Sequence, residues 1–240
     1  AYILASESCA LDTIGAEFVR DVDPGEIVTI TQKGIESNRS MCIPKEQHAR
    51  CIFEYIYFAR PDAYIDGVSV YESRLIAGRS LAKHHPVNAD LVVGVPESGN
   101  VAAMGYAMES GIPYGMAFVK NSYVGRTFIK PKQSSRESSV RIKLNVLTEA
   151  VKGKRVIMID DSIVRGTTSD RIVGMLREAG AKEVHVRISS PPFLHPCYFG
   201  TDIPSEDQLI AHNRSVDEIC KIIGADSLAY LDCLLYTSPS

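Results

Sequence analysis

The feature that most constrains the fold is a short apolar run, residues 156–159, that ends in two adjacent carboxylates, Asp160 and Asp161. The run is rich in Ile and Val and follows Gly153 closely, which is typical of a buried strand in a parallel sheet. The residues after it are small and rich in hydroxyl groups, and they lead into the helical pattern of residues 172–176. The sequence therefore predicts a strand, a loop and a helix in succession, with both carboxylates where the strand ends.

A strand end of this kind favours ligand binding, because open α/β sheets bind ligands at the carboxyl ends of their strands. Backbone N–H groups of the loop at 162–169, together with the helix dipole, can bind a phosphate. Asp160 and Asp161 can accept hydrogen bonds from sugar hydroxyls or bind Mg²⁺, directly or through water. Together they indicate a ribose 5-phosphate site. The structural alternative is that Thr167 or Ser169 caps the helix and the aspartates form a solvated strand end.

The rest of the chain alternates short apolar runs with helical patterns, which favours a mostly parallel sheet flanked by helices. Residues 1–40 differ: they show short strands, at 2–8 and 26–30, that cannot form a core by themselves. The other expected elements are helices at 70–81, 101–108 and near 140–151, strands at 91–95, 114–119 and 184–188, and two helical segments near 205–211 and 216–224.

Composition excludes several classes of protein. A formal net charge of −3 over 240 residues argues against a nucleic-acid-binding domain, which is usually basic. No apolar stretch is long enough to cross a bilayer, and no secretory signal precedes the first strand. We therefore expect a cytoplasmic enzyme with neither nucleic acid nor membrane as a partner. Its six scattered cysteines are weak evidence for disulfides in that compartment.

Three stretches of sequence resemble known proteins. Residues 160–169 closely resemble the phosphoribosyl pyrophosphate (PRPP) motif of type I phosphoribosyltransferases. Residues 120–129 (KNSYVGRTFI) and 57–62 (YFARPD) resemble, more specifically, the amidophosphoribosyltransferase family, glutamine-dependent enzymes that start purine synthesis. The resemblance runs from near residue 1 to about residue 233. It implies an α/β, type I phosphoribosyltransferase fold with a central mostly parallel sheet flanked by helices, plus an N-terminal β remnant of a glutaminase domain.

The resemblance also implies three segments. Residues 1–40 would be the C-terminal remnant of the Ntn-type glutamine amidotransferase domain, residues 41–233 the phosphoribosyltransferase domain, and residues 234–240 a tail that does not match the family. The glutaminase nucleophile and the glutamine-binding segments would then precede Ala1. We therefore expect any activity of this chain to depend on free ammonia.

The family's site residues carry over to matching positions. Those implied to be catalytic, over the ribose or in a lid over PRPP, are Asp160, Asp161, Lys120, Tyr123 and Arg126. Those implied to bind PRPP, in a pyrophosphate loop and a 5-phosphate loop, are Glu97, Ser98, Gly99, Ser162, Arg165, Gly166, Thr167, Thr168 and Ser169. Mg²⁺ would be bound by Ser98, Asp160 and Asp161.

A second cofactor is implied by two cysteines. Cys51 and Cys197 match two of the four ligands of the [4Fe–4S] cluster found in one branch of the family, whose other two ligands would lie beyond this chain. Without the resemblance, cysteines so far apart would be read as small buried hydrophobic residues. The family further implies purine nucleotides as feedback inhibitors and a homo-oligomer.

The reaction implied is displacement of pyrophosphate from C1 of PRPP by ammonia, which gives 5-phosphoribosylamine. Two alternatives stay open. The first is another type I phosphoribosyltransferase, acting on a nucleobase, because the motif loops of these enzymes overlap. The second is a non-catalytic, PRPP-binding regulatory protein. The stretch at 120–128 and the N-terminal remnant favour the amidophosphoribosyltransferase family over both.

Overall fold

The structure is a computed structural model that describes residues 1–44, 49–120, 144–201 and 203–232. Two compact units make up the chain, Ala1–Ser73 and Arg74–Ser240. The predicted tail at 234–240 lies outside the described residues. The boundary predicted between residues 40 and 41 separates segments that derive from two different domains. The division into compact units does not test that derivation, so the boundary stays a prediction.

The first unit has little regular structure. The strand expected at 26–30 is confirmed as β1, which pairs antiparallel with β2. The strand expected at 2–8 is wrong: a helix, α1, begins at Ser8, where Ala10 and Leu11 favour helix over strand. The elements of this unit are α1 (Ser8–Thr13), β1 (Ile27–Thr31), β2 (Gly34–Asn38), the π-helix η2 (Glu54–Phe58), β3 (Tyr64–Ile65) and β4 (Val68–Ser69).

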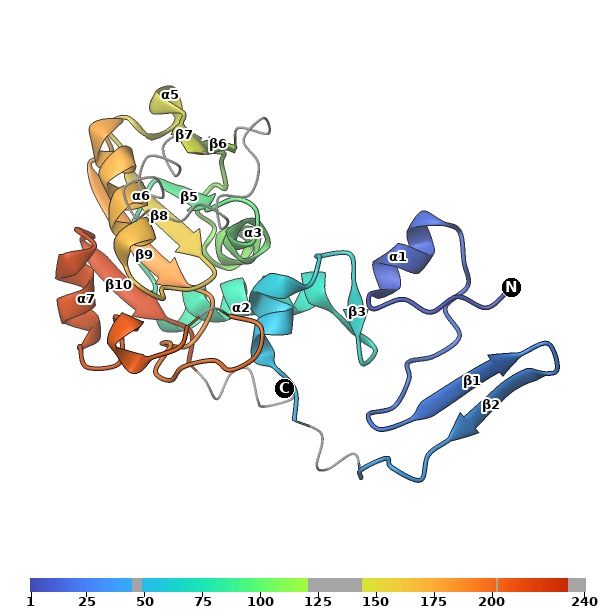
Figure 1. The fold of residues 1–240 in the computed structure, drawn as a ribbon. Coiled ribbons are helices and arrows are strands. Elements are labelled where there is room, and N and C mark those ends of the chain that lie inside the picture. The colour runs from blue at the N-terminus through green and yellow to red at the C-terminus, as the bar shows by residue number, and fades with distance from the viewer. Residues whose placement is uncertain (45–48, 121–143, 202, 233–240) are drawn as a thin grey trace. The chain divides into compact units, whose positions relative to one another are not determined.

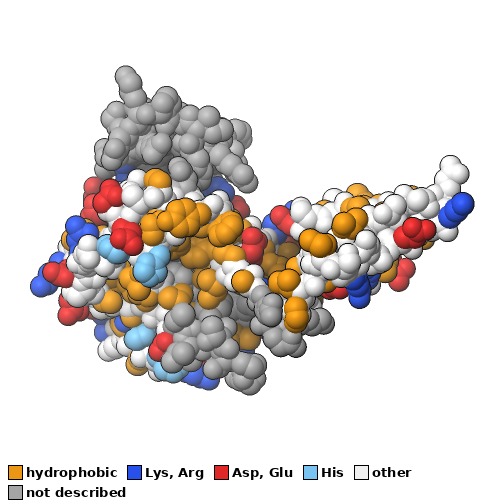
Figure 2. Space-filling model, turned by 60° about the horizontal axis from the view of Figure 1, so that its bottom comes forward, with side chains coloured by type: hydrophobic (Ala, Val, Ile, Leu, Met, Phe, Trp, Pro, Cys, Tyr) orange, Lys and Arg blue, Asp and Glu red, His pale blue; other side chains and the backbone are white. Residues whose placement is uncertain are grey.

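The buried part of the first unit is small, with Cys9, Ala59, Ala63 and Val70 as its cluster of buried residues. Large hydrophobic side chains remain exposed on this unit, including those of Ile27, Ile30 and Ile35 in the β1–β2 hairpin. Exposed hydrophobic side chains of this unit are drawn in orange in the right-hand part of Figure 2. An exposed apolar hairpin is a surface that usually pairs with or is covered by another segment. The expectation that these strands cannot form a core by themselves agrees with this.

A four-stranded sheet with the strand order β10-β9-β8-β5 forms the centre of the second unit, and all three strand pairs are parallel (Figure 1). Its strands are β5 (Leu91–Gly94), β8 (Arg155–Asp160), β9 (Glu183–Ile188) and β10 (Ser227–Tyr230). The first three lie where the sequence predicts strands. The sequence analysis missed β10, a run of only four residues that begins with the polar Ser227.

Helices cover both faces of this sheet (Figure 1). On one face, α2 (Val70–His84) and α3 (Gly99–Ser110) pack against Ile157 and Ile159 of β8. On the other face, α6 (Thr167–Glu178) and α7 (Val216–Ile222) share a core with Met158. Successive residues of β8 thus face opposite layers, which explains why the strand is apolar throughout rather than alternating. The expected parallel sheet flanked by helices is confirmed.

Shorter elements complete the second unit: β6 (Phe118–Lys120) and β7 (Leu144–Val146), which pair antiparallel, then α5 (Thr148–Val151) and the 3₁₀ turn η4 (Glu206–Gln208). The helix expected near 140–151 is wrong for residues 144–146. Leu144 and Val146 pack against the core while Asn145 is exposed, an alternation that suits a strand. Within the described ranges, no helix has both the length and the apolar character needed to span a bilayer.

The helices α2 and α3 cross where two glycines bring their backbones together. A Cβ atom at Gly105 would lie 2.2 Å from the carbonyl oxygen of Leu75, and one at Gly78 would lie 1.8 Å from that of Ala102. Both distances are shorter than real Cβ contacts. The close packing of α2 and α3 therefore requires a residue without a side chain, glycine, at both positions.

We expect Gly105→Ala to lower the free energy of unfolding by about 1–3 kcal/mol, because the added methyl group must push the two helices apart. The matched control is Gly174→Ala on α6, where a Cβ would meet nothing within 4 Å. The control should raise the free energy of unfolding by up to about 1 kcal/mol, since alanine favours helix. Urea denaturation followed by circular dichroism measures both. A Gly105→Ala midpoint at or above that of the parent would contradict the close crossing.

Candidate functional site

The two carboxylates lie at the end of the central strand β8. Asp160 is its last residue and Asp161 follows it, and only 7% and 8% of their surfaces are exposed. The carbonyl oxygen of Asp160 accepts hydrogen bonds from the N–H of Ser189 at 2.9 Å and from its hydroxyl at 3.3 Å. The N–H of Asp161 donates to Oδ1 of Asp160 at 2.9 Å. The pair is therefore buried in the sheet edge, and the alternative of a solvated strand end is wrong.

The loop that follows β5 meets this pair. The N–H of Val95 donates to the carbonyl oxygen of Ile159 at 2.8 Å, and a Cβ at Gly99 would lie 2.5 Å from the same oxygen. Only glycine allows so close an approach. The Ser98 hydroxyl donates to Oδ2 of Asp161.

The other carboxylate oxygen of Asp161 accepts a hydrogen bond from the next residue in the chain, Ser162. The Ser162 hydroxyl donates to Oδ1 at 2.5 Å. Since Ser98 follows β5 and Ser162 follows β8, Asp161 links the loop predicted to bind pyrophosphate to the loop predicted to bind the 5-phosphate. One side chain thus positions both halves of the candidate site.

Burial raises the pKa of both carboxyl groups. For Asp160 the negative charge of Asp161 adds to this effect, while the hydrogen bond from the N–H of Asp161 opposes it. For Asp161 the hydroxyls of Ser162 and Ser98, and then the positive charge of Arg74, oppose the rise in pKa. Two buried carboxyl groups side by side are costly to ionise without a cation. A cation bound at their oxygens would remove much of that cost.

Arg74 is a site residue that the sequence analysis missed. Its side chain is 3% exposed on α2, and its charge lowers the pKa of Asp161. The sequence does contain a signal. Arg74 lies four residues after the buried Val70 and three before the buried Ala77, so it occupies the apolar face of its helix. A charged side chain on such a face is rarely buried unless it has a partner.

Two helices begin at this site without a side-chain cap. The N-cap of α6 is Gly166, at φ +81°, and the N-cap of α3 is Ser98, whose hydroxyl binds Asp161 instead. In the described part of the chain, no side chain at either N-cap accepts a hydrogen bond from a backbone N–H of the first helical turn. By contrast, Ser215 forms a full capping box at the start of α7. The structural alternative of a cap by Thr167 or Ser169 is therefore wrong. At the start of α3 the N–H groups of Gly99 and Asn100 donate to the carbonyl oxygens of Val95 and Glu97, at 3.0 and 3.3 Å, so that helix favours an anion through its dipole. At the start of α6 the helix dipole and the N–H groups of the first turn favour an anion.

The predicted residues of the 5-phosphate loop surround the start of α6. Gly166 and Ser169 are buried, whereas Thr167 and Thr168 are exposed in the first turn. Arg165 is exposed, and its Nε donates to Oε1 of Gln208 at 3.2 Å. Gln208 was not predicted, because it lies more than forty residues away in sequence, in η4.

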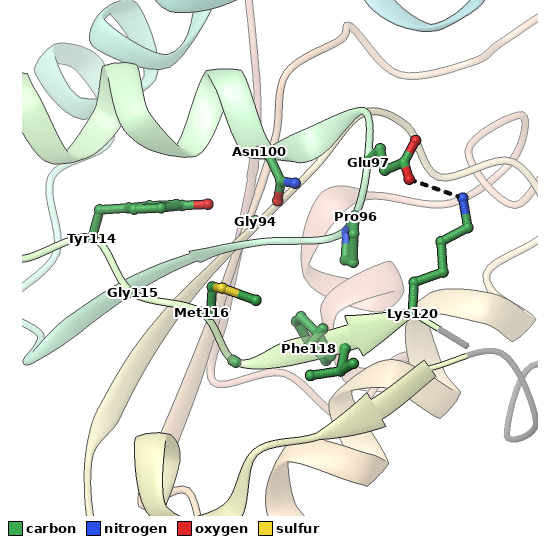
Figure 3. Close-up of a pocket in the computed structure, with 11 residues that line it drawn as sticks. Gly94, Pro96, Glu97, Asn100, Tyr114, Gly115, Met116, Phe118 and Lys120 are labelled. Atoms are coloured by element: carbon green, nitrogen blue, oxygen red, sulfur yellow. Dashed lines mark hydrogen bonds and ion pairs between the residues drawn. The ribbon is translucent and has the colours of Figure 1, made fainter. Parts of the chain in front are cut away.

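Two further predicted residues pair with each other. Nζ of Lys120 lies 3.2 Å from Oε1 of Glu97, and Figure 3 shows the two side chains pointing toward one another. Both are exposed, so the ion pair contributes little to stability and either side chain is free to turn to a ligand. They flank a cavity of about 290 Å³ lined also by Gly94, Pro96, Asn100 and residues 114–119. Tyr123 and Arg126 lie outside the described residues.

The donor atoms at the strand end are oxygens, two carboxylates and the hydroxyl of Ser98. Across the described ranges, no group of three or more His, Cys, Asp or Glu residues is arranged to hold a metal ion. A metal held by these three side chains would complete its coordination shell with water. An oxygen-only donor set with water suits Mg²⁺.

The two predicted cluster ligands lie in different units. Cys51 is exposed in the first unit, and Cys197 lies in the second, in the connection between β9 and η4. The N–H of Phe199 donates to Sγ of Cys197 at 3.4 Å. The Thr201 hydroxyl and the N–H groups of residues 199–201 lower the pKa of Cys197 to about 7. Cys197 is therefore substantially a thiolate near neutral pH.

We expect Asp160→Asn to raise the free energy of unfolding at pH 7 in the absence of divalent cations. The folded pKa of Asp160 is raised, so as pH rises past the ordinary value the unfolded chain loses its proton first and stability falls. Asparagine removes that cost and retains the acceptor for the N–H of Asp161. Each unit of pKa difference between the folded and unfolded states corresponds to about 1.4 kcal/mol of stability.

Urea denaturation at pH 7 and at pH 3 measures this effect. The gain should vanish at pH 3, where aspartate is protonated in both states, and exposed Asp207→Asn should change little at either pH. Equal or lower stability of Asp160→Asn at pH 7 would contradict a buried pair that is costly to ionise.

Comparison with known proteins agrees with this geometry. Residues 72–189 match the family profile described as the phosphoribosyl transferase domain. The amidophosphoribosyltransferase of Archaeoglobus fulgidus is 57% identical over 230 residues, which are 96% of this chain and 50% of that protein. The amidophosphoribosyltransferase of Bacillus subtilis is 54% identical over 232 residues, 96% of this chain and 48% of that protein.

Solved structures agree as well. The glutamine PRPP amidotransferase from B. subtilis, complexed with ADP and GMP, superposes with a TM-score of 0.86 at 53% identity, over 96% of this chain and 50% of that one. The expected type I phosphoribosyltransferase fold is confirmed. The chain spans about half the length of the curated relatives it matches. By its sequence and its fold, the chain belongs to the amidophosphoribosyltransferase family.

Proposed function

We propose that this chain carries the ribose-transfer site of an amidophosphoribosyltransferase, which forms 5-phosphoribosylamine from PRPP and ammonia and releases pyrophosphate, the first step of purine synthesis. The observation that carries the proposal is the buried pair Asp160 and Asp161, of which Asp161 accepts a hydrogen bond from Ser98, beside the starts of α3 and α6, which have no side-chain cap. A ligand with hydroxyls between two phosphate groups matches that arrangement.

The reaction needs positioning and electrostatics rather than a nucleophile from the protein. Breaking the bond at C1 builds positive charge on the ribose and negative charge on the departing pyrophosphate. Asp160 and Asp161 would hold the ribose hydroxyls and stabilise the positive ring. The 5-phosphate, bound by Arg165 and the first turn of α6, would anchor the substrate away from the reacting bond. The start of α3, through its helix dipole, would receive the pyrophosphate.

Mg²⁺ fits this site, since the donors are carboxylate and hydroxyl oxygens and a bound cation would offset the cost of ionising two buried carboxyl groups. Asp160, Asp161 and Ser98 would hold it, directly or through water. When bound, the ion would neutralise charge on the pyrophosphate. Lys120, released from Glu97, would contribute a second positive charge at the same end of the substrate.

Other parts of the proposal follow from the relatives. The B. subtilis enzyme is described in complex with ADP and GMP, which supports purine nucleotides as feedback ligands here too. Glutamine as the source of ammonia, a glutaminase origin for residues 1–40, a homo-oligomer and a cytoplasmic location belong to the same proposal. A closing role for Tyr123 and Arg126 is retained from the sequence.

The test is pyrophosphate release from PRPP with ammonium as the nitrogen donor and Mg²⁺ present. We expect Asp161→Asn to lower kcat by about 10²–10³-fold, since losing one preorganised charge at a reacting centre has an effect of that order. Asp207→Asn, an exposed carboxylate outside the site, should be unchanged. Rates within about twofold of the parent for Asp161→Asn would contradict the assigned role. PRPP binding without turnover in folded parent protein would instead favour the regulatory alternative.

We further propose that Cys197 is a ligand of a [4Fe–4S] cluster, with Cys51 as another. Its lowered pKa and the N–H donor from Phe199 support a thiolate at this position, because cluster ligands are thiolates. Cys220 makes a matched control: it is half-buried, its Sγ donates to Ala225, and burial raises its pKa.

In cluster-free protein, we expect alkylation of Cys197 by iodoacetamide to reach half its maximal rate at about pH 7, as its pKa requires. Alkylation of Cys220 should need higher pH, because only the thiolate reacts. Mass spectrometry of peptides after timed quenching gives both rates. Equal rates for the two cysteines across the pH range would rule out a thiolate-stabilising environment at Cys197.

A further inference from the structure

The 5-phosphate loop rests on a segment that lies far from it in sequence, residues 206–212, which we call the buttress segment. The N–H of Ile210 donates to the carbonyl oxygen of Val164 at 2.9 Å. A Cβ at Gly166 would lie only 2.4 Å from Cδ1 of Ile210, whose own surface is 5% exposed. The backbone of residues 164–166, which leads into α6, thus packs against Ile210 of the buttress segment.

The buttress segment also contacts a charged side chain of the loop. Oε1 of Gln208 accepts from Nε of Arg165 at 3.2 Å and from Nη2 of the same guanidinium. Two bonds to one acceptor restrict a long exposed side chain that would otherwise sample many rotamers. Because an amide is neutral, this acceptor orients the guanidinium without offsetting its positive charge.

Gln208 is itself held in place by the turn that carries it. The N–H of Leu209 donates to the carbonyl oxygen of Glu206 at 3.0 Å, and the Leu209 side chain is 2% exposed. The Glu206 carboxylate pairs with Nε2 of His212 at 3.1 Å. The turn is therefore fixed on both sides of Gln208, which lets the amide act as a defined acceptor.

We propose that Gln208 is a positioning residue for phosphate binding: it holds the Arg165 guanidinium at the start of α6, where the cation meets the 5-phosphate of the substrate. The inference rests on the proposed function, because it needs a ligand whose phosphate binds at that helix start. Gln208 acts through Arg165 and does not contact the reacting atoms. It therefore governs substrate binding more than the chemical step.

The experiment is a double-mutant cycle on pyrophosphate release, with Gln208→Ala, Arg165→Ala and the double variant. We expect Gln208→Ala to raise KM for PRPP by about threefold to tenfold, the range for the net contribution of a typical hydrogen bond, with kcat within about twofold of the parent. The double variant should resemble Arg165→Ala alone, because Gln208 acts through that side chain. Gln208→Glu retains an acceptor but places a negative charge beside Arg165, so KM should stay raised in that variant too.

Three results would overturn the inference. The first is an unchanged KM for Gln208→Ala in an active parent. The second is additive effects of the two substitutions, which would mean that they act separately. The third is a fall in kcat and melting temperature without a change in KM, which would mark a purely structural role. Asp207→Asn, next to Gln208, is the control for general damage to η4. No PRPP-dependent activity in the folded parent would instead overturn the proposed function and this inference together.

Discussion

The site depends on the hydrogen bonds that converge on the Asp161 carboxylate. Ser98 donates to one oxygen from the loop after β5, and Ser162 donates to the other from the loop after β8. Burial raises the pKa of this carboxyl, and the two hydroxyls and Arg74 oppose that rise. One buried side chain thus connects the loops that lead into α3 and α6. The free-energy cost of burying the ionised carboxylate is partly offset by the two serine hydroxyls and Arg74. A bound cation could offset it further.

This interaction needs the parallel sheet beneath it. The register Gly94 to Ile159 in the β5–β8 pair, and Asp160 to Ile188 in the β8–β9 pair, brings three strand ends to one edge. Gly99 then allows the β5 loop to touch the carbonyl oxygen of Ile159. Glycines at the α2–α3 crossing let the two helices that cover one face of this sheet approach closely. Packing in the core and chemistry at the edge are therefore parts of one arrangement.

The sequence predicted what local pattern can specify. The apolar run of β8, the carboxylates at its end and the small residues before α6 are contiguous, so their placement follows from the strand-loop-helix pattern. Arg74 and Gln208 reach the site only through tertiary packing, and no local spacing connects them to Asp161 or Arg165. The strand expected at 2–8 and the helix expected at 144–146 fail for a related reason. The structure of a short segment depends on the surface against which it packs. The periodicity of apolar residues in the sequence does not reveal that surface.

The most direct test of the central claim is calorimetric titration of PRPP into the protein with Mg²⁺ present, for the parent and for Asp161→Asn. The account predicts binding of one PRPP per chain in the parent, weakened at least tenfold in the variant, because the variant loses the charge that links the two loops and holds the cation. Removing Mg²⁺ should weaken binding in the parent far more than in the variant. Equal affinities for the two proteins, with the same dependence on Mg²⁺, would contradict it.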